Sequence, residues 1–326
     1  MIELRKGIQS IIEACEAVKP GESILVIAED DSESVLKGQA FMNVINSMDA
    51  EVVLTVITAH DTTGHEPPAL VATAMKSVDA IFCIAEKAGV SHTSARKEAL
   101  AAGARFYGLY QAPVKDLSSG LSVTDIQIIK ERTEKLTQRL SRADTARVTT
   151  RMGTDVTLGL AGREGVAVHP LCAIEESSNV TVLPDYAEAA IAPVEGTAEG
   201  TIVIDLAMRI WGYLLKEPLR YTVKEGKVID ISGSKDDADA LRKIAATDEN
   251  ASNIAELGIG TSHIIPGSMQ GAARDFARVG TAHIGIGRNN DVGGKTWSQI
   301  HLDGLLNKPT IELDNDFILR DGAILI

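Results

Sequence analysis

Residues 23–58 carry the pattern that decides the fold: Ser-Ile-Leu-Val-Ile-Ala at 23–28, a segment with helical spacing of its apolar residues at 33–46, and Val-Val-Leu-Thr-Val-Ile-Thr at 52–58. The first and last pieces are short, apolar and rich in β-branched residues, as buried strands are. Two such strands joined by a helix predict a βαβ unit, in which the strands lie parallel and the crossover is right-handed.

The same alternation continues beyond this unit. Strands are predicted at 80–84 and 105–109, with helices at 67–77 and 94–102. The amino-terminal part is therefore predicted to be a doubly wound α/β domain with a Rossmann-like parallel sheet. We expect no nucleotide site in it, because the first strand is followed by Glu29-Asp30-Asp31-Ser32, which would repel a pyrophosphate, and not by a Gly-x-Gly-x-x-Gly motif.

The composition changes after a long predicted helix at 123–142, where we place the domain boundary. Residues 1–143 then form the α/β domain, and residues 144–326 form a β-rich α+β domain of short alternating runs. Within the second domain, Glu225-Gly226 predicts the turn of a β-hairpin, and a helix is predicted at 235–246.

Composition and charge limit the kinds of partner. The chain has 326 residues, 44% hydrophobic and 24% charged, with a formal net charge of −13. An acidic chain without clustered Lys and Arg is a poor match for nucleic acid or an anionic membrane surface, so a small molecule or a peptide is the expected substrate. The sequence contains no apolar run of about 20 residues and no signal-peptide pattern at its start, and this predicts a cytoplasmic protein.

The segment from residue 280 to residue 304 is rich in glycine and carries polar side chains at the ends of strand-like pieces. His301 and Asp303 are two residues apart, so an extended backbone puts both on one face of a strand, where one metal ion can bind both. Imidazole nitrogen and carboxylate oxygen together suit zinc, manganese, iron or cobalt. With Glu188, Glu256 and His283, they form a candidate divalent-metal site.

Four blocks of the second domain follow one another in order: Leu-Pro-Asp-Tyr-Ala-Glu at 183–188 with the run to 205, Asn-Ile-Ala-Glu-Leu-Gly-Ile-Gly at 253–260, Gly-Thr-Ala-His-Ile-Gly-Ile-Gly at 280–287, and Ile-His-Leu-Asp-Gly at 300–304. Together they resemble the aminopeptidase T family of metallopeptidases. The resemblance implies a homodimer and a centre of two divalent ions (zinc, cobalt or manganese) that hydrolyses peptide or small amide bonds. The ligands it implies are Glu188, Glu256, His283, His301 and Asp303.

Under this hypothesis the protein is a metallohydrolase in which a metal-bridged hydroxide attacks the carbonyl. Glu256 would bridge the ions, and Asn290 or Arg288 would stabilise the oxyanion. One position departs from the family: its aminopeptidases have a tyrosine seven residues beyond the histidine that matches His283, and this chain has Asn290 there. Asparagine can donate a hydrogen bond but cannot act as a phenol acid.

A second branch of the same superfamily, the 2,5-dihydroxypyridine 5,6-dioxygenases, resembles this chain in length and in Gly-Gly-Lys at 293–295 followed by His301 and Asp303. Those enzymes hold one ferrous ion with two histidines and one aspartate. Their remaining histidine falls at Glu256 of this chain, so the sequence favours the hydrolase as the main hypothesis and a mononuclear iron ring-cleaving dioxygenase as the alternative. A third hypothesis is a non-catalytic, metal-stabilised binding protein.

Overall fold

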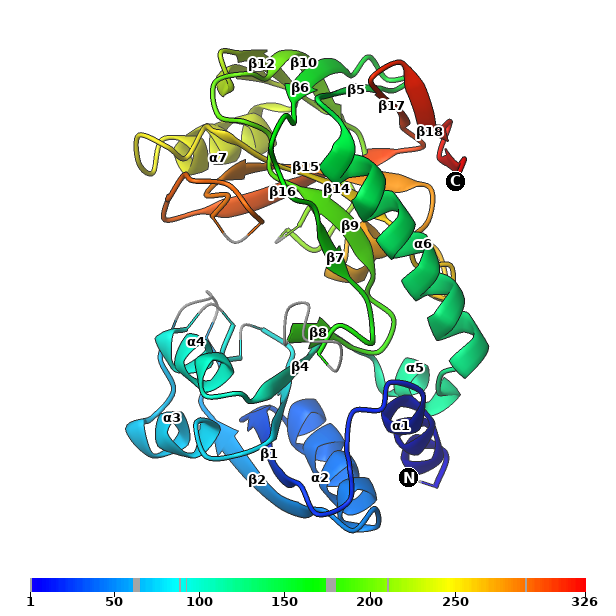
Figure 1. Ribbon diagram of the computed structural model, residues 1–326. Coiled ribbons are helices and arrows are strands. Elements are labelled where there is room, and N and C mark those ends of the chain that lie inside the picture. Colours follow the sequence, from blue (N-terminus) through cyan, green and yellow to red (C-terminus); the bar gives the residue numbers. More distant parts are fainter. Residues whose placement is uncertain are drawn as a thin grey trace. The chain divides into compact units, whose positions relative to one another are not determined.

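The chain folds into two compact units (Figure 1). The computed structural model describes residues 2–60, 65–87, 89–91, 93–173, 180–209, 211–290 and 292–326. The first unit is made of Met1–Lys130 and His169–Tyr186, and the second of Glu131–Val168 and Ala187–Ile326. The chain therefore passes between the units three times, whereas the sequence predicts a single crossing near residue 143.

A five-stranded parallel sheet forms the centre of the first unit, with strand order β2-β1-β3-β4-β8. The last strand explains why residues 169–186 join this unit: it pairs with β4 through only three residues, Phe106 to Gly108, and is too short for a sequence pattern to reveal. The strands are β1 Ser23–Glu29, β2 Glu51–Ile57, β3 Ala80–Ala85, β4 Arg105–Tyr110 and β8 Val180–Val182.

Helices cover both faces of this sheet, as the doubly wound prediction requires. Side chains alternate along a strand, so β1 contributes Ile24 and Val26 to one hydrophobic cluster and Leu25 and Ile27 to another. Helices α1, α2 and α5 pack in the first cluster, and α3 and α4 in the second. The helices are α1 Ile2–Ala14, α2 Ser32–Asn46, α3 Ala69–Met75, α4 Ser94–Ala101, α5 Val114–Ser119 and α6 Val123–Arg142, whose carboxyl-terminal part belongs to the second unit.

The strand order reverses between β1 and β3, which is where open α/β sheets commonly bind ligands. Here the buried carboxylate of Glu29 occupies this edge of the sheet. It accepts hydrogen bonds from the backbone N–H groups of Glu86, Lys87 and Gly89, at 2.8 to 2.9 Å. The backbone donors that a phosphate would need at this position are thus bound to a side chain of the protein itself.

The second unit contains two antiparallel sheets that stack as layers (Figure 1). Their facing sides share one hydrophobic core, to which Val148 and Ile202 contribute from one sheet and Ile284 and Leu302 from the other. The eight-stranded sheet contains β13 Lys227–Ser232, β12 Leu219–Lys224, β10 Glu199–Ile204, β6 Asp155–Gly159, β5 Thr145–Thr149, β17 Thr310–Leu313, β18 Asp316–Arg320 and β19 Ala323–Ile324. The six-stranded sheet contains β11 Ala207–Met208, β16 His301–Asn307, β15 Thr281–Gly287, β14 Ile254–Gly260, β9 Glu188–Ile191 and β7 Val166–Val168.

Local predictions in the second unit are confirmed. Strands β12 and β13 form a hairpin whose turn residues, Glu225 and Gly226, both have positive φ angles, 49° and 75°. The helix predicted at 235–246 is α7, Lys235–Ala245. The mixed fold with one parallel sheet and two antiparallel sheets therefore agrees with the predicted α/β plus α+β class. Among the helices of the described residues, none combines the length and hydrophobicity of a bilayer span.

Candidate metal centre

Four neighbouring strands of the six-stranded sheet, β9, β14, β15 and β16, bring together the five predicted ligands. Glu256 of β14 pairs with Gly285 of β15, which pairs in turn with Asp303 of β16. Because alternate residues share a face, Ile284 and Ile286 enter the core while His283 lies on the opposite side of β15. The site therefore lies on the face of the sheet that is turned away from the sandwich core.

Glycines opposite the ligands leave the room that the site needs. A Cβ atom on Gly258 would lie 2.0 Å from His283 Nε2, and one on Gly285 would lie 2.8 Å from Asp303 Oδ1. Any larger residue at either position would occupy the space of a ligand side chain. Gly258 and Gly285 are thus required by the site and not by a turn.

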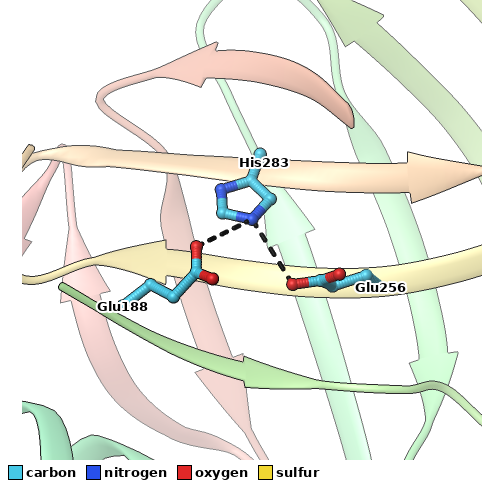
Figure 2. A group of neighbouring side chains, drawn as sticks. All are labelled: Glu188, Glu256 and His283. Atoms are coloured by element: carbon cyan, nitrogen blue, oxygen red, sulfur yellow. Dashed lines mark ion pairs between the residues drawn. The ribbon is translucent and has the colours of Figure 1, made fainter. Parts of the chain in front are cut away.

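The first group of ligands, which we call the His283 group, consists of Glu188, Glu256 and His283 (Figure 2). Figure 2 shows both carboxylates pointing toward one imidazole nitrogen. His283 Nε2 is 3.3 Å from Glu188 Oε2 and 3.5 Å from Glu256 Oε1. The His283 side chain is 1% exposed, so this is an interior site.

The second group, which we call the His301 group, consists of Glu256, His301 and Asp303. His301 Nε2 is 3.0 Å from Glu256 Oε2 and 3.0 Å from Asp303 Oδ1. Within each group the potential ligand atoms lie within 4.8 Å of one another. Glu256 belongs to both groups and offers one oxygen to each, so its carboxylate joins them into one five-residue centre.

Without a cation, the buried carboxylates are balanced by the histidines. Burial raises the pKa of Glu256, but hydrogen bonds with His283 and His301 outweigh it and lower that pKa to about 2. Burial likewise raises the pKa of Asp303, and the charge of His301 and its hydrogen bond reverse the effect and lower it. Burial lowers the pKa of His301, yet Asp303 and Glu256 raise it well above 6.5. A buried set of three carboxylates needs compensating charge, and a divalent cation supplies it as well as protons do.

The donor set fits a divalent transition metal. Asp303 Oδ1 is buried and faces the centre of the His301 group, where it lies 3.0 Å from His301 Nε2. His301 Nδ1 lies 2.7 Å from the backbone carbonyl oxygen of Arg288, which can accept a hydrogen bond from Nδ1–H. That bond favours the tautomer in which Nε2 carries a free lone pair toward Glu256 and Asp303.

Arg209, which the sequence reasoning missed, lies beside the His301 group. Its Nη1 is 3.5 Å from Asp303 Oδ2, its backbone N–H donates to the Asp303 carbonyl at 3.0 Å, and its guanidinium stacks over Phe276 at 5.6 Å. The residue lies just beyond the two-residue strand β11, which pairs with β16. No spacing in the sequence links positions 209 and 303, so only the sheet register brings them together.

Of the two residues predicted to stabilise an oxyanion, one contacts the site through its backbone and the other is exposed. Arg288 contributes its backbone carbonyl to the orientation of His301, a role that its side chain does not signal. Asn290 is exposed in a turn after β15, whereas its neighbour Asn289 is fully buried. Catalytic roles for the side chains of Arg288 and Asn290 stay predictions.

Comparisons with solved structures agree with this fold. The chain is similar to the 2,5-dihydroxypyridine dioxygenase from Pseudomonas putida KT2440, with 17% sequence identity, a TM-score of 0.81, and coverage of 99% of this chain and 96% of that chain. It is also similar to wild-type AmpT from Thermus thermophilus, with 16% identity, a TM-score of 0.68, and coverage of 100% of this chain and 99% of that chain. Both likenesses show that the chain shares the fold of these proteins. Comparison with curated protein sequences finds no match.

A family model corrects the predicted reaction. The model described as NicX, 2,5-dihydroxypyridine 5,6-dioxygenase, matches residues 3–326. The prediction of a metallohydrolase, with its aminopeptidase, metalloprotease and amide-hydrolysis activities, is therefore wrong, and the alternative of a ring-cleaving dioxygenase is the better one. The physical reason is that carboxylate and imidazole ligands define a metal site without defining the reaction that the metal assists. On the match across nearly its whole length, this chain belongs to the NicX family of 2,5-dihydroxypyridine 5,6-dioxygenases.

Proposed function

We propose that this chain is a metal-dependent dioxygenase that opens a dihydroxylated pyridine ring, with an ion held by Glu256, His301 and Asp303. The family description names this reaction, and the similar structure from Pseudomonas putida KT2440 is a 2,5-dihydroxypyridine dioxygenase. A bound ferrous ion supplies the redox chemistry through which dioxygen and an aromatic ring react.

The geometry of the His301 group carries this proposal. One imidazole nitrogen lies 3.0 Å from an oxygen of each of two carboxylates, inside a chain that matches a dioxygenase family over residues 3–326. Two carboxylates neutralise the charge of one divalent ion, whereas the two-histidine, one-aspartate set expected for this branch leaves one positive charge uncompensated. Glu256 therefore makes this site more electronegative than the expected one and favours tight binding of a cation.

The His283 group holds a second divalent ion in this proposal. Glu188 and Glu256 each offer a carboxylate oxygen and His283 offers an imidazole nitrogen, and these three atoms lie within 4.8 Å of one another. Glu256 would bridge the two ions. Three carboxylates then offset three of the four positive charges. Support for a second ion comes from the burial of this group, because a carboxylate pair around a buried imidazole needs a cation or a proton to balance it.

Residues around the ligands have defined tasks in the reaction. The Arg288 carbonyl orients His301 by accepting its Nδ1–H. The guanidinium of Arg209, 33% exposed, lies 3.5 Å from Asp303 Oδ2 and would attract a deprotonated ring hydroxyl of the substrate. The apolar layer of the sandwich core behind the sheet closes that side of the site to water.

Oxygen consumption tests the proposal. Protein purified without oxygen and reconstituted with ferrous iron is mixed with 2,5-dihydroxypyridine and its positional isomers, and oxygen uptake is followed together with loss of the ring absorbance. We expect one dioxygen consumed per ring opened, loss of activity in His301→Ala, and retention in His263→Ala, a histidine exposed to solvent. Metal bound without oxygen uptake on any ring substrate would reject the dioxygenase and favour a metal-stabilised binding protein.

A further inference from the structure

The loop of the second unit that joins β15 to β16 carries the carbonyl that orients His301. Arg288 begins the loop, and its backbone N–H donates to the carbonyl of Ile300 at 2.8 Å, which closes the base of the loop. The position of the Arg288 carbonyl therefore depends on how the rest of the loop is held. A loop ordinarily moves more than the strands it joins, so a metal ligand oriented by a loop carbonyl needs a restraint.

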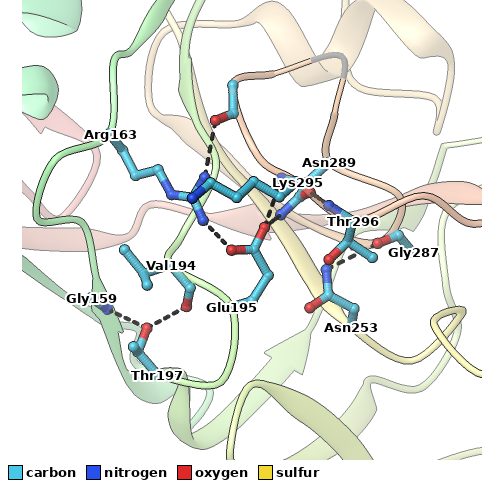
Figure 3. A network of polar contacts seen from close by, with 11 residues as sticks. Gly159, Arg163, Val194, Glu195, Thr197, Asn253, Gly287, Asn289, Lys295 and Thr296 are labelled. Carbon is cyan, nitrogen blue, oxygen red and sulfur yellow. Dashed lines mark hydrogen bonds and ion pairs between the residues drawn. The ribbon is translucent and has the colours of Figure 1, made fainter.

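Glu195, in the connection between β9 and β10, supplies that restraint. Its Oε1 accepts hydrogen bonds from Asn289 Nδ2 at 2.9 Å and from the Lys295 backbone N–H at 2.8 Å. Its Oε2 forms an ion pair with Arg163, whose Nη1 also donates to the Gly293 carbonyl at 3.0 Å. One carboxylate thus holds the loop at both its start and its middle, directly and through an arginine (Figure 3).

Asn289 folds the loop around its own amide group. Its Oδ1 accepts from the Thr296 N–H at 2.7 Å, and its backbone N–H donates to the Thr296 carbonyl at 3.0 Å. Its carbonyl accepts from the Gly294 N–H at 2.8 Å, and a Cβ on Gly294 would lie 2.1 Å from Asn289 Cγ. Asn289 is fully buried, so its backbone N–H, its carbonyl oxygen and its Oδ1 need these partners.

The connection that carries Glu195 is itself fixed to the eight-stranded sheet. Thr197 Oγ1 donates to the Val194 carbonyl at 2.6 Å and accepts from the Gly159 N–H at 3.1 Å, and the Val194 N–H donates to the Gly159 carbonyl at 2.8 Å. Hydrogen bonds therefore fix Val194 and Thr197, on either side of Glu195, to β6, and Glu195 in turn holds Asn289, the residue beside Arg288.

We propose that Glu195 and Asn289 are positioning residues for metal binding: they hold the Arg288 carbonyl where it fixes the His301 tautomer. The inference rests on the proposed function only in taking His301 as a metal ligand. The His301–Arg288 hydrogen bond is 2.7 Å long, and a displacement of about 1 Å would break it, because donor and acceptor beyond about 3.5 Å no longer form one. His301 could then turn its protonated nitrogen toward the ligand side.

Metal affinity tests the inference without any turnover. Wild type, Glu195→Gln and Asn289→Asp are titrated with zinc alone in a calorimeter, and folding is checked by chemical denaturation. Removing a group that orients a metal ligand costs about 10-fold to 100-fold in affinity, and we expect a loss in this range for both variants. The matched control is Glu22→Gln in the first unit, because Glu22, like Glu195, forms an ion pair with an arginine and accepts a hydrogen bond from a backbone N–H.

Two further measurements separate positioning from general stability. In zinc-loaded, ¹⁵N-histidine-labelled protein, wild type should show His301 with its proton on Nδ1, and the variants should show a mixture of tautomers. The double variant Glu195→Gln with Asn289→Asp exchanges donor and acceptor between the two side chains, and it should recover part of the affinity. Folded variants with wild-type zinc affinity and an unchanged His301 spectrum would overturn the inference.

These outcomes are independent of the dioxygenase proposal. If wild type binds zinc through His301 but consumes no oxygen on any ring substrate, the proposed function fails and the positioning role stands. If Glu195→Gln does not fold, the Asn289→Asp spectrum decides, because that change is isosteric and leaves the Glu195–Arg163 pair in place.

Discussion

The substitution Gly285→Ala should weaken metal binding while leaving the fold in place. An added Cβ would lie 2.8 Å from Asp303 Oδ1, 3.1 Å from Glu256 Cβ and 3.3 Å from His301 Cε1, so one methyl group meets all three members of the His301 group. The Asp303 carboxylate is the closest, and it can turn away at modest cost to stability. Productive metal sites hold their ligands within about 0.5 Å, so this turn should lower metal affinity about 10-fold to 100-fold. That is roughly 1.4 to 2.8 kcal/mol of binding free energy.

The matched control is Gly304→Ala on the neighbouring strand. Its Cβ would point into the sandwich core, 2.4 Å from Ile204 Cδ1 and 2.6 Å from Ile204 Cγ1. Overpacking of a core costs about 1 to 3 kcal/mol of folding free energy, so this variant should be destabilised but should bind metal as wild type does. The assay is zinc or ferrous iron titration beside urea denaturation of each variant. Wild-type metal affinity in folded Gly285→Ala would refute the assigned centre.

Three other changes follow from the same geometry. Glu188→Gln should reduce the metal content by one ion per chain and leave the His301 group loaded, as measured by elemental analysis; two ions retained would contradict the assignment of Glu188. Removal of the metal with a chelator should lower the apparent free energy of unfolding by about 2.7 kcal/mol when the free ion was present at 100 times its Kd, which calorimetry detects as a lower Tm. In metal-free protein, the raised pKa of His301 stabilises the fold fully below pH 6.5, and this contribution is lost as the pH rises through the folded value. The pKa of Glu256, lowered to about 2, adds stability above pH 4.5 that is lost as the pH falls toward 2. Resistance to urea should therefore be greatest between pH 4.5 and pH 6.5. This maximum should be weaker in His301→Ala.

The parts of the fold that the sequence predicts are those set by the local periodicity of apolar residues. Residues 23–58 alone predict the βαβ unit, because the periods of strand and helix and the length of each piece are local properties. The assignment of residues 169–186 to the first unit is not local. It depends on the pairing of Val180–Val182 with β4, some seventy positions earlier in the chain, and three residues carry too little pattern to predict a partner.

The candidate site also has parts that the sequence predicts and parts that it does not. The spacing of His301 and Asp303 predicts a shared face, and the structure places both with Glu256 as expected. The groups that orient them leave no such mark. A backbone carbonyl such as that of Arg288 has no residue signature, and the value of Gly258 and Gly285 becomes visible only when the strand register sets them opposite His283 and Asp303.

The position after β15 shows how a difference of one residue changes the interpretation. The sequence directs attention to Asn290, because the aminopeptidases it resembles have a tyrosine there, and an asparagine could assist an oxyanion. In the structure the neighbouring Asn289 is the buried residue, with its amide bound to Glu195 and Thr296, while Asn290 is exposed. β15 ends at Gly287, so beyond it the two-residue period no longer decides which side chain turns inward. The hydrogen bonds of the loop decide instead, and they fix Asn289 next to the Arg288 carbonyl, which bonds to the candidate ligand His301. An exposed Asn290 and a structural Asn289 leave this part of the site without the phenol acid expected of a peptidase, which agrees with the family match to a dioxygenase.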